Sequence, residues 1–261
     1  MRNPRVILKY ARLRGRQATR DVLLRATATG DIHREDLARR YLWGNGIEIG
    51  AMHLSLRVPP RASVRYVDIM TREELLARYG PSNHFPAGWV VETDVVDDGQ
   101  SLRTFADDSV DFIVANHMLE HTEDPIAALE AFLRVVRVGG VLFVTLPDAR
   151  RSFDALRART TIEHLVRDHV EGPAVSREGH HREWAAVECL IGDEVERRIG
   201  QFACEDAHHH FHVWELETFL SLLLALDLPM AIEYAGVNDD EFTVITRRTA
   251  RKAHVEQAPD G

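Results

Sequence analysis

The sequence is nearly without lysine, because Lys9 and Lys252 are the only lysines among 32 basic residues. Schiff-base enzymes, Walker-type phosphate sites and the Tyr-x-x-x-Lys pair of short-chain dehydrogenases all need a lysine at a defined place, so these classes are excluded. Cysteine is equally scarce. Cys189 and Cys204 are too few for a disulfide framework or for a four-cysteine zinc site.

The chain also lacks any uninterrupted apolar run of about 18 residues, the length that a membrane-spanning helix needs. The basic stretch 2–20 has no apolar run after it, which argues against a secretion signal. It resembles a transit peptide or a membrane-surface helix in charge, but a solvated helix packed on the domain is the simpler interpretation. We therefore expect a cytoplasmic protein without a membrane partner.

The 261 residues carry a net charge of −9, which argues against a nucleic-acid backbone as partner. With 45% hydrophobic residues, the chain is long enough for one α/β domain over 1–261. Apolar runs and helical patterns alternate along it. The expected strands are 46–50, 64–68, 89–94, 111–117, 141–146, 230–237 and 242–247, and the expected helices include 71–80, 124–137 and 215–226.

The stretch Gly46-Ile47-Glu48-Ile49-Gly50-Ala51 is the centre of the prediction. It is a short apolar strand that ends at a glycine turn, where a ligand can approach the backbone. The next strand ends at Asp68, the place where a βαβ unit puts a carboxylate for a ribose diol. Since a pyrophosphate avoids negative charge, Glu48 favours a cationic ligand such as S-adenosylmethionine.

These segments resemble the class I S-adenosylmethionine-dependent methyltransferases of the type 11 branch. The resemblance rests on Gly46–Ala51, Tyr66–Asp68, Val96–Gly99, Ala115–His121, Asp124–Ile126, Gly139–Gly140 and Leu146–Asp148. It implies a Rossmann-like, seven-stranded, mostly parallel sheet with an antiparallel C-terminal edge hairpin, N-terminal helices and a helical insertion after the fifth strand. It further implies an N-terminal helical lid (1–42), a substrate-covering insertion (149–214) and a polar tail (249–261). Met52 departs from the family, which has a second glycine there, so the turn is expected to lie less close to the ligand.

The resemblance also assigns the cofactor-binding residues. Glu48 and Gly50 would flank the methionine part of the cofactor, and Ala51 would offer backbone groups. Asp68 would bind the ribose hydroxyls, Asp94 the adenine amine, and Asn116 would lie at the rim of the fourth strand. Both aspartates have an alternative role, because each can cap a turn after its strand.

Histidine is concentrated late in the chain, with eight of the 14 between 164 and 212. A neutral imidazole there can take the proton of an alcohol acceptor. His117, at a strand tip, is the preferred base, and His121 the more structural residue. The catalytic candidates are His117, Asp148, His180 and His212.

A metal site is a second interpretation of this histidine-rich segment. If 180–190 is helical, His180 and Glu183 share a face, and if 209–214 is extended, His210 and His212 share one. Magnesium would prefer Asp148, Asp154 or Glu183, whereas imidazoles suit zinc. The metal candidates are Asp148, Glu183 and His210, with Mg²⁺ as a second cofactor.

The expected reaction is methyl transfer from S-adenosylmethionine to a hydroxyl of a small sugar or glycoside. The block Asn116–His121 and the histidine-bearing insertion resemble sugar O-methyltransferases of polysaccharide biosynthesis, including methylmannose polysaccharide synthesis. Two alternatives stay open: an N- or O-methyltransferase of a small natural product, and a noncatalytic S-adenosylmethionine-binding domain. A homodimer is compatible with the sequence but not required by it.

Overall fold

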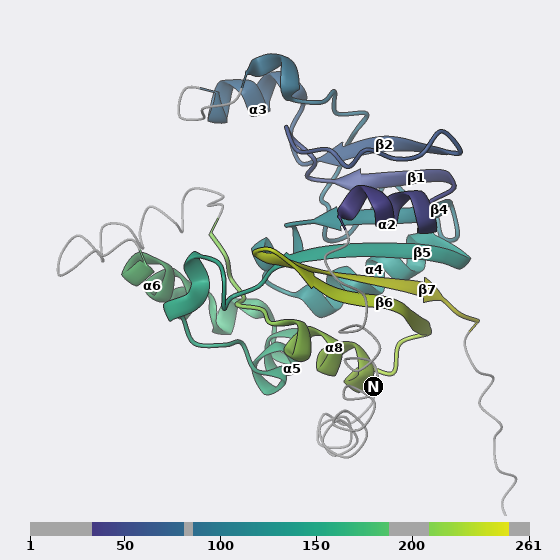
Figure 1. Ribbon diagram of the computed structural model, residues 1–261. Helices are drawn as coiled ribbons and strands as arrows, with labels where there is room; N and C mark the ends of the chain where they lie inside the picture. The colour runs from purple at the N-terminus through teal and green to yellow at the C-terminus, as the bar shows by residue number, and fades with distance from the viewer. Residues whose placement is uncertain (1–32, 81–85, 188–208, 251–261) are drawn as a thin grey trace, which may run out of the picture.

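The computed structural model describes residues 33–80, 86–187 and 209–250, and within these ranges the chain forms one seven-stranded sheet (Figure 1). The strand order is β3-β2-β1-β4-β5-β7-β6. The strands are β1 (Gly44–Ile49), β2 (Ala62–Asp68), β3 (Val95–Val96), β4 (Val110–Asn116), β5 (Val136–Pro147), β6 (Met230–Asn238) and β7 (Glu241–Arg248). β7 runs antiparallel to β5 and β6, while the other neighbours are parallel. The predicted Rossmann-like sheet with an antiparallel edge hairpin is confirmed.

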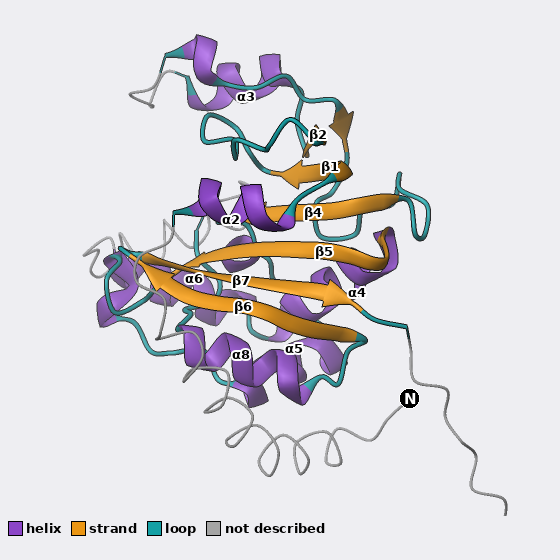
Figure 2. Ribbon diagram, turned by 45° about the vertical axis from the view of Figure 1, so that its right-hand side comes forward, coloured by secondary structure: helices purple, strands orange, loops and turns teal. Residues whose placement is uncertain are grey.

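Helices cover both faces of this sheet, as Figure 2 shows. They are α2 (Arg34–Tyr41), α3 (Arg72–Tyr79), α4 (Pro125–Val135), α5 (Ile162–Glu171), α6 (Arg177–Val187) and α8 (Leu216–Ala225). Leu37 and Leu42 at α2 pack in one core layer with Phe112 and Phe143 of the sheet. The larger core lies on the opposite face, where α4, α5 and α8 contribute their apolar sides.

Four short 3-10 helices complete the described part. They are η1 (Ala87–Trp89), η2 (Leu119–His121), η3 (Phe153–Leu156) and η4 (Pro173–Val175). The expected capping box of α3 is present, since the Thr71 hydroxyl accepts from the Glu74 amide and the Glu74 carboxylate accepts from the Thr71 amide. Asp124 caps α4 by accepting from the Ala127 amide at 2.9 Å.

Two predicted elements were wrong. The third strand was expected at 89–94, but β3 follows Asp94 and has two residues. The carbonyls of Ala87 and Val90 accept hydrogen bonds from the Arg72 guanidinium of α3, so they are not available for pairing with β2.

The helix predicted over 124–137 ends at Val135, and Gly139 and Gly140, the residues expected to stop it, lie inside β5. A Cβ on Gly140 would lie 2.7 Å from the Asp111 carbonyl oxygen. This glycine therefore permits close strand packing instead of stopping a helix.

The carboxyl ends of the parallel strands meet at one edge of the sheet. Figure 1 shows α3 and α6 lying toward that edge, on the left of the view. Of the predicted lid, the described residues 33–42 contain α2, which packs on the sheet face, and the remainder lies outside the described residues, as does most of the polar tail. Within the described ranges, no helix is long and apolar enough to span a membrane.

Candidate active site

A pocket of about 610 Å³ opens at the carboxyl ends of the parallel strands. β1 contributes Ile49, the turn after it contributes Gly50, and β2 contributes Asp68. The opposite wall comes from the predicted insertion, with Arg177 of α6 and Phe211 among its residues. Its volume lies in the range of small-molecule sites, and carboxyl ends of parallel strands are the usual place for them. We call it the strand-end pocket.

The turn after β1 forms the floor of this pocket. Gly50 has φ +66°, and a Cβ placed there would meet no atom within 4 Å, so the turn is open toward the pocket. Met52, at the position of the missing second glycine, also has a left-handed backbone, with φ +45°. A non-glycine residue in that conformation costs about 1 kcal/mol, and such strain is concentrated at functional sites.

Two carboxylates from successive strand ends face the pocket. Asp68 lines it, and burial raises the pKa of this carboxyl group above its usual value. Asp98 lines it together with Gly99 and Gln100, after β3. A Cβ on Gly99 would lie 2.4 Å from the Ile49 side chain, which explains the glycine.

Asp94 lies elsewhere. Its amide donates to the Tyr66 carbonyl oxygen at 2.9 Å, and its Oδ2 accepts from the Tyr66 amide at 2.7 Å. Asp94 does not line the strand-end pocket, and Asp98 is the acid that does. Asp98 is not among the candidates predicted from the sequence because the third strand is expected at 89–94 instead of Val95–Val96, although Val96–Gly99 belongs to the family pattern.

Glu48 lies behind the glycine turn and not in the pocket wall. Its two carboxylate oxygens accept from the Leu56 amide at 2.9 and 3.0 Å, and Asn116 Nδ2 lies 3.4 Å from Oε1. The side chain is fully buried, and this burial raises its pKa to about 7 despite the Leu56 hydrogen bond. Glu48, Asn116 and Ala51 therefore shape the turn, and none of the three lines the pocket.

His117 lines the pocket from the tip of β4 and is held between two carboxylates. Its Nδ1 lies 3.2 Å from Glu120 Oε1 and its Nε2 lies 2.9 Å from Glu241 Oε2. Burial opposes the charge, but the hydrogen bonds that His117 donates to Glu120 and Glu241 outweigh it and raise the pKa of His117 to about 9. A protonated imidazole with both nitrogens engaged is a poor proton acceptor at neutral pH, so the geometry does not favour His117 as the base.

We expect His117 to keep its proton until about pH 9. Since the folded-state pKa lies above the unfolded value of about 6.5, the ion pairs stabilise the fold fully below pH 6.5 and lose this contribution as the pH rises toward 9. NMR titration of the imidazole signals measures the pKa of His117, and the signal of His117 is identified as the one that is absent in His117→Gln. Titration of that signal near pH 6.5 would contradict the pairing of His117 with Glu120 and Glu241.

Other imidazoles in the pocket are neutral. His121 Nδ1 donates to the His209 carbonyl oxygen at 3.1 Å, which leaves Nε2 with the lone pair. Burial lowers the pKa of His121 and of His181, and it lowers that of His209 to about 3. The wall formed by these residues therefore offers proton-accepting nitrogens at neutral pH.

The three metal candidates named from the sequence do not come together. Asp148 is paired with Arg150 Nη2 at 2.7 Å, and Glu183 Oε2 lies 3.1 Å from Arg157 Nη2. His210 Nδ1 lies 2.6 Å from Asp154 Oδ2. None of the three candidates lines the strand-end pocket. The predicted Mg²⁺ site from Asp148, Glu183 and His210 is therefore not assembled, because different partners bind each side chain.

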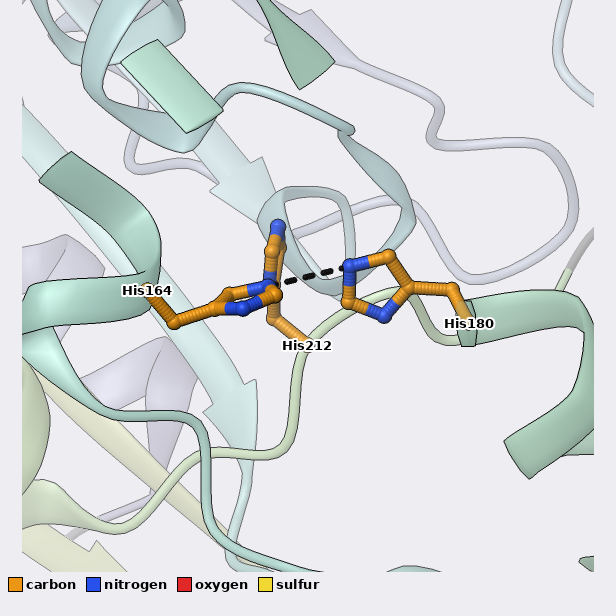
Figure 3. A group of neighbouring side chains, drawn as sticks. All are labelled: His164, His180 and His212. Carbon is orange, nitrogen blue, oxygen red and sulfur yellow. Dashed lines mark hydrogen bonds between the residues drawn. The ribbon is translucent and has the colours of Figure 1, made fainter. Parts of the chain in front are cut away.

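His180 and His212 do come together, outside the pocket wall, and with a histidine that the sequence analysis did not select. Figure 3 shows the rings of His164, His180 and His212 converging from α5, α6 and the segment before α8. One nitrogen of each lies within 4.8 Å of the others. His164 was missed because no helix was predicted at 162–171.

A second group of ligating side chains is formed by Glu120, His121 and His210, again within 4.8 Å of one another. Each has a partner: Glu120 pairs with His117, His121 contacts the His209 carbonyl oxygen, and His210 contacts Asp154. These contacts connect the β4 tip, η2 and the segment before α8 into one buried polar network.

In a comparison with known protein families, residues 44–144 match the family described as a methyltransferase domain. No curated protein matches the chain.

Several solved structures are similar to this chain, but distantly. A possible exported protein from Bordetella parapertussis shares 14% identity over 84% of this chain and 66% of its own, with a TM-score of 0.43. An S-adenosylmethionine-dependent methyltransferase from Methanosarcina mazei shares 17% sequence identity over 84% of this chain and 99% of its own, with a TM-score of 0.46. Another S-adenosylmethionine-dependent methyltransferase, from Aquifex aeolicus, shares 14% sequence identity over 95% of this chain and 100% of its own, with a TM-score of 0.42. At these values the likenesses carry no argument about function.

Proposed function

We propose that this protein is an S-adenosylmethionine-dependent methyltransferase that methylates a hydroxyl group of a small, neutral, polar acceptor, with a sugar or glycoside as the preferred class. One observation carries the proposal. A single pocket runs from the strand ends that present Gly50 and Asp68 to a wall of neutral imidazoles. The methyltransferase-domain match over 44–144 covers the strand-end half of this pocket.

The strand-end half fits the cofactor. The open turn at Gly50 leaves room beside the backbone, and Asp68 offers a carboxylate for a ribose diol. Asp98 and the close approach at Gly99 lie where the adenine end would be bound. When bound, the cofactor would supply an electrophilic methyl group for in-line displacement. The protein then has mainly to orient the acceptor oxygen toward that carbon.

The insertion half fits an uncharged acceptor. Arg177 Nη2 donates to Glu123 Oε2 at 2.8 Å, so the arginine on this wall is already neutralised by a carboxylate. Phe211 and Tyr79 add aromatic surface, and Thr122 adds a hydroxyl. A mixture of paired charges, hydroxyl and aromatic groups suits a ligand with several hydroxyl groups more than a carboxylate or phosphate.

Proton removal is assigned to His121 in place of His117. An alcohol must lose its proton during transfer, and the neutral His121, whose Nδ1 donates to the His209 carbonyl oxygen, carries its basic lone pair on Nε2. His117, as imidazolium, is proposed to bind acceptor or cofactor oxygen electrostatically instead. Asp148, His180, His212 and a magnesium ion have no part in this mechanism.

None of the tryptophans in the described residues lines the pocket, so none offers a stacking surface for a sugar there. Trp214 is fully buried in the core, and Trp89 is largely exposed on the surface. The sugar therefore rests on the polar wall, and a small phenolic or amine natural product is the alternative acceptor. An association of two copies of the chain stays a prediction from the sequence.

The test has two steps. Calorimetry should show binding of S-adenosylhomocysteine, with NAD as the matched nucleotide control that does not bind. Release of labelled methyl to a panel of glycosides, phenols and amines then identifies the acceptor class, and turnover of a glycoside is the expected result. Binding of NAD in preference to the thioether would refute the cofactor, and transfer to amines alone would refute the hydroxyl acceptor.

A further inference from the structure

The three-histidine cluster has a fourth member of a different kind. Asp168 lies one turn after His164 on α5, and its side chain is almost fully buried. Its Oδ2 lies 3.1 Å from His164 Nε2 and 3.8 Å from His180 Nε2, and the two imidazole nitrogens lie 3.1 Å apart. Three elements thus bring three imidazoles together, and Asp168 Oδ2 lies beside two of them, His164 and His180.

These separations have the size of a metal coordination shell. A tetrahedral zinc ion with bonds of about 2.0–2.1 Å places neighbouring ligand atoms about 3.3 Å apart. The observed values of 3.1, 3.1 and 3.8 Å bracket that edge length. The ligand atom of His212 also lies within 4.8 Å of those of His164 and His180. The three imidazoles can therefore enclose one ion after side-chain rotations, with Asp168, which lies next to two of them, as the fourth ligand.

Two polar atoms in the cluster are buried without a hydrogen-bond partner in the described part of the chain: His212 Nδ1 and Asp168 Oδ2. Buried polar atoms are nearly always paired, so such exceptions need a cause. Both belong to side chains that are at least nine-tenths buried. A cation between them would give His212 Nδ1 its missing partner and would bind Asp168 Oδ2, whose nearest neighbour is His164 Nε2 at 3.1 Å.

The surroundings orient the same atoms. His212 Nε2 lies 3.3 Å from the Glu123 carbonyl oxygen, which fixes the proton there and leaves Nδ1 with its lone pair. Ser176 donates to Asp168 Oδ1 at 2.6 Å and leaves Oδ2 directed at the histidines. Metal-binding histidines and carboxylates typically have outer contacts of this kind.

One contact has to change when a cation binds. The Arg167 Nη2 donates to His164 Nδ1 at 3.0 Å, so the proton of that ring is on Nε2 in this arrangement. A metal on Nε2 moves the proton to Nδ1, and the guanidinium must then turn away. The Arg167 side chain is half exposed and also bonds to Ser176, so it has room to move.

We propose that His164, His180, His212 and Asp168 form a structural binding site for a divalent metal ion of the zinc class. Three imidazoles with one carboxylate select zinc and its neighbours over magnesium or calcium, which prefer oxygen ligands. Four protein ligands leave no open position, so the ion would hold structure and not catalyse. It would join α5, α6 and the segment before α8, which together support the acceptor wall. The inference does not depend on the proposed methyltransferase function.

The experiment uses the full chain, stripped with EDTA and titrated with zinc in competition with a chromogenic chelator. We expect about one tightly bound zinc ion per chain, a higher Tm with zinc, and with cobalt the intense visible absorption of a tetrahedral site. His180→Ala and His212→Ala are expected to weaken zinc binding by more than about 100-fold, and Ser176→Ala by about 10- to 100-fold. Asp168→Asn keeps the side-chain shape and provides a ligand variant with little risk to folding.

His169→Ala is the matched control, since His169 follows Asp168 on α5 but contacts Asp124 instead of the cluster. It should bind zinc like the wild type. His210→Ala tests the neighbouring group of Glu120, His121 and His210 and should also retain zinc. The proposal is overturned if the stripped wild type takes up no zinc, if His180→Ala and Asp168→Asn bind it unchanged, or if His210→Ala alone loses it.

Discussion

Replacing Asp68 with alanine is expected to weaken binding of S-adenosylhomocysteine by at least about 100-fold. Hydrogen bonds to a charged group contribute about 1.5–3 kcal/mol each, and a ribose diol makes two of them. Since each 1.4 kcal/mol is a factor of ten, the loss of both reaches that size. Asp68 lines the pocket at the end of β2. It is the only acidic residue of that strand, so no other carboxylate of β2 can replace it in the alanine variant. Calorimetry on the wild type and the variant measures the difference.

Asp94→Asn is the matched control for this prediction. The asparagine oxygen can still accept from the Tyr66 amide, so the fold should be kept and binding should change by less than about threefold, in line with a distant surface substitution. Asp68→Asn, with the same chemical change inside the pocket, should lose affinity clearly. A larger loss of affinity in Asp94→Asn than in Asp68→Asn would restore Asp94 as the cofactor contact and would contradict the assignment of Asp68 from the pocket.

The fold was predictable because its signals are local. The unbroken apolar run that became β4 is buried on both faces, and the Asn238–Asp240 turn marks the β6–β7 hairpin. The error at the third strand has a different cause. Residues 89–94 have strand-like composition, but Arg72 donates to the carbonyl oxygen of Val90, 18 positions later, and to that of Ala87 just before the segment. No sequence window contains that contact.

The site was predictable where one strand end fixes one residue, as at Gly50 and Asp68. It was not predictable where residues distant in sequence meet. His117 is at the strand tip as expected, but its charge depends on Glu241, 124 positions away on the antiparallel strand β7. Likewise His180 and His212 were selected as candidates, while His164 and Asp168 came from an unpredicted helix. Protonation states and ligand sets depend on tertiary contacts, and a sequence pattern does not contain them.

Removing the lone-pair nitrogen of His121 is expected to lower kcat by about 10²- to 10⁴-fold, the usual contribution of a general base, with little change in cofactor affinity. His121→Asn is the informative variant. The asparagine amide occupies the place of the Nδ1 half of the ring, so it can still donate to the His209 carbonyl oxygen, but it has no counterpart of Nε2. The measurement is kcat with saturating acceptor, beside calorimetry with S-adenosylhomocysteine.

His121→Gln and His117→Gln complete the argument. Glutamine places its amide near the Nε2 position but carries no basic nitrogen, so His121→Gln should lose activity as His121→Asn does. His117→Gln removes an imidazolium with both nitrogens engaged, and its effect should appear in KM more than in kcat. Because burial lowers the pKa of His121 below 6.5, kcat of the wild type should be constant across neutral pH and fall only in acid. Full activity of His121→Asn would show that the acceptor needs no base from this side chain, which is the behaviour of an amine.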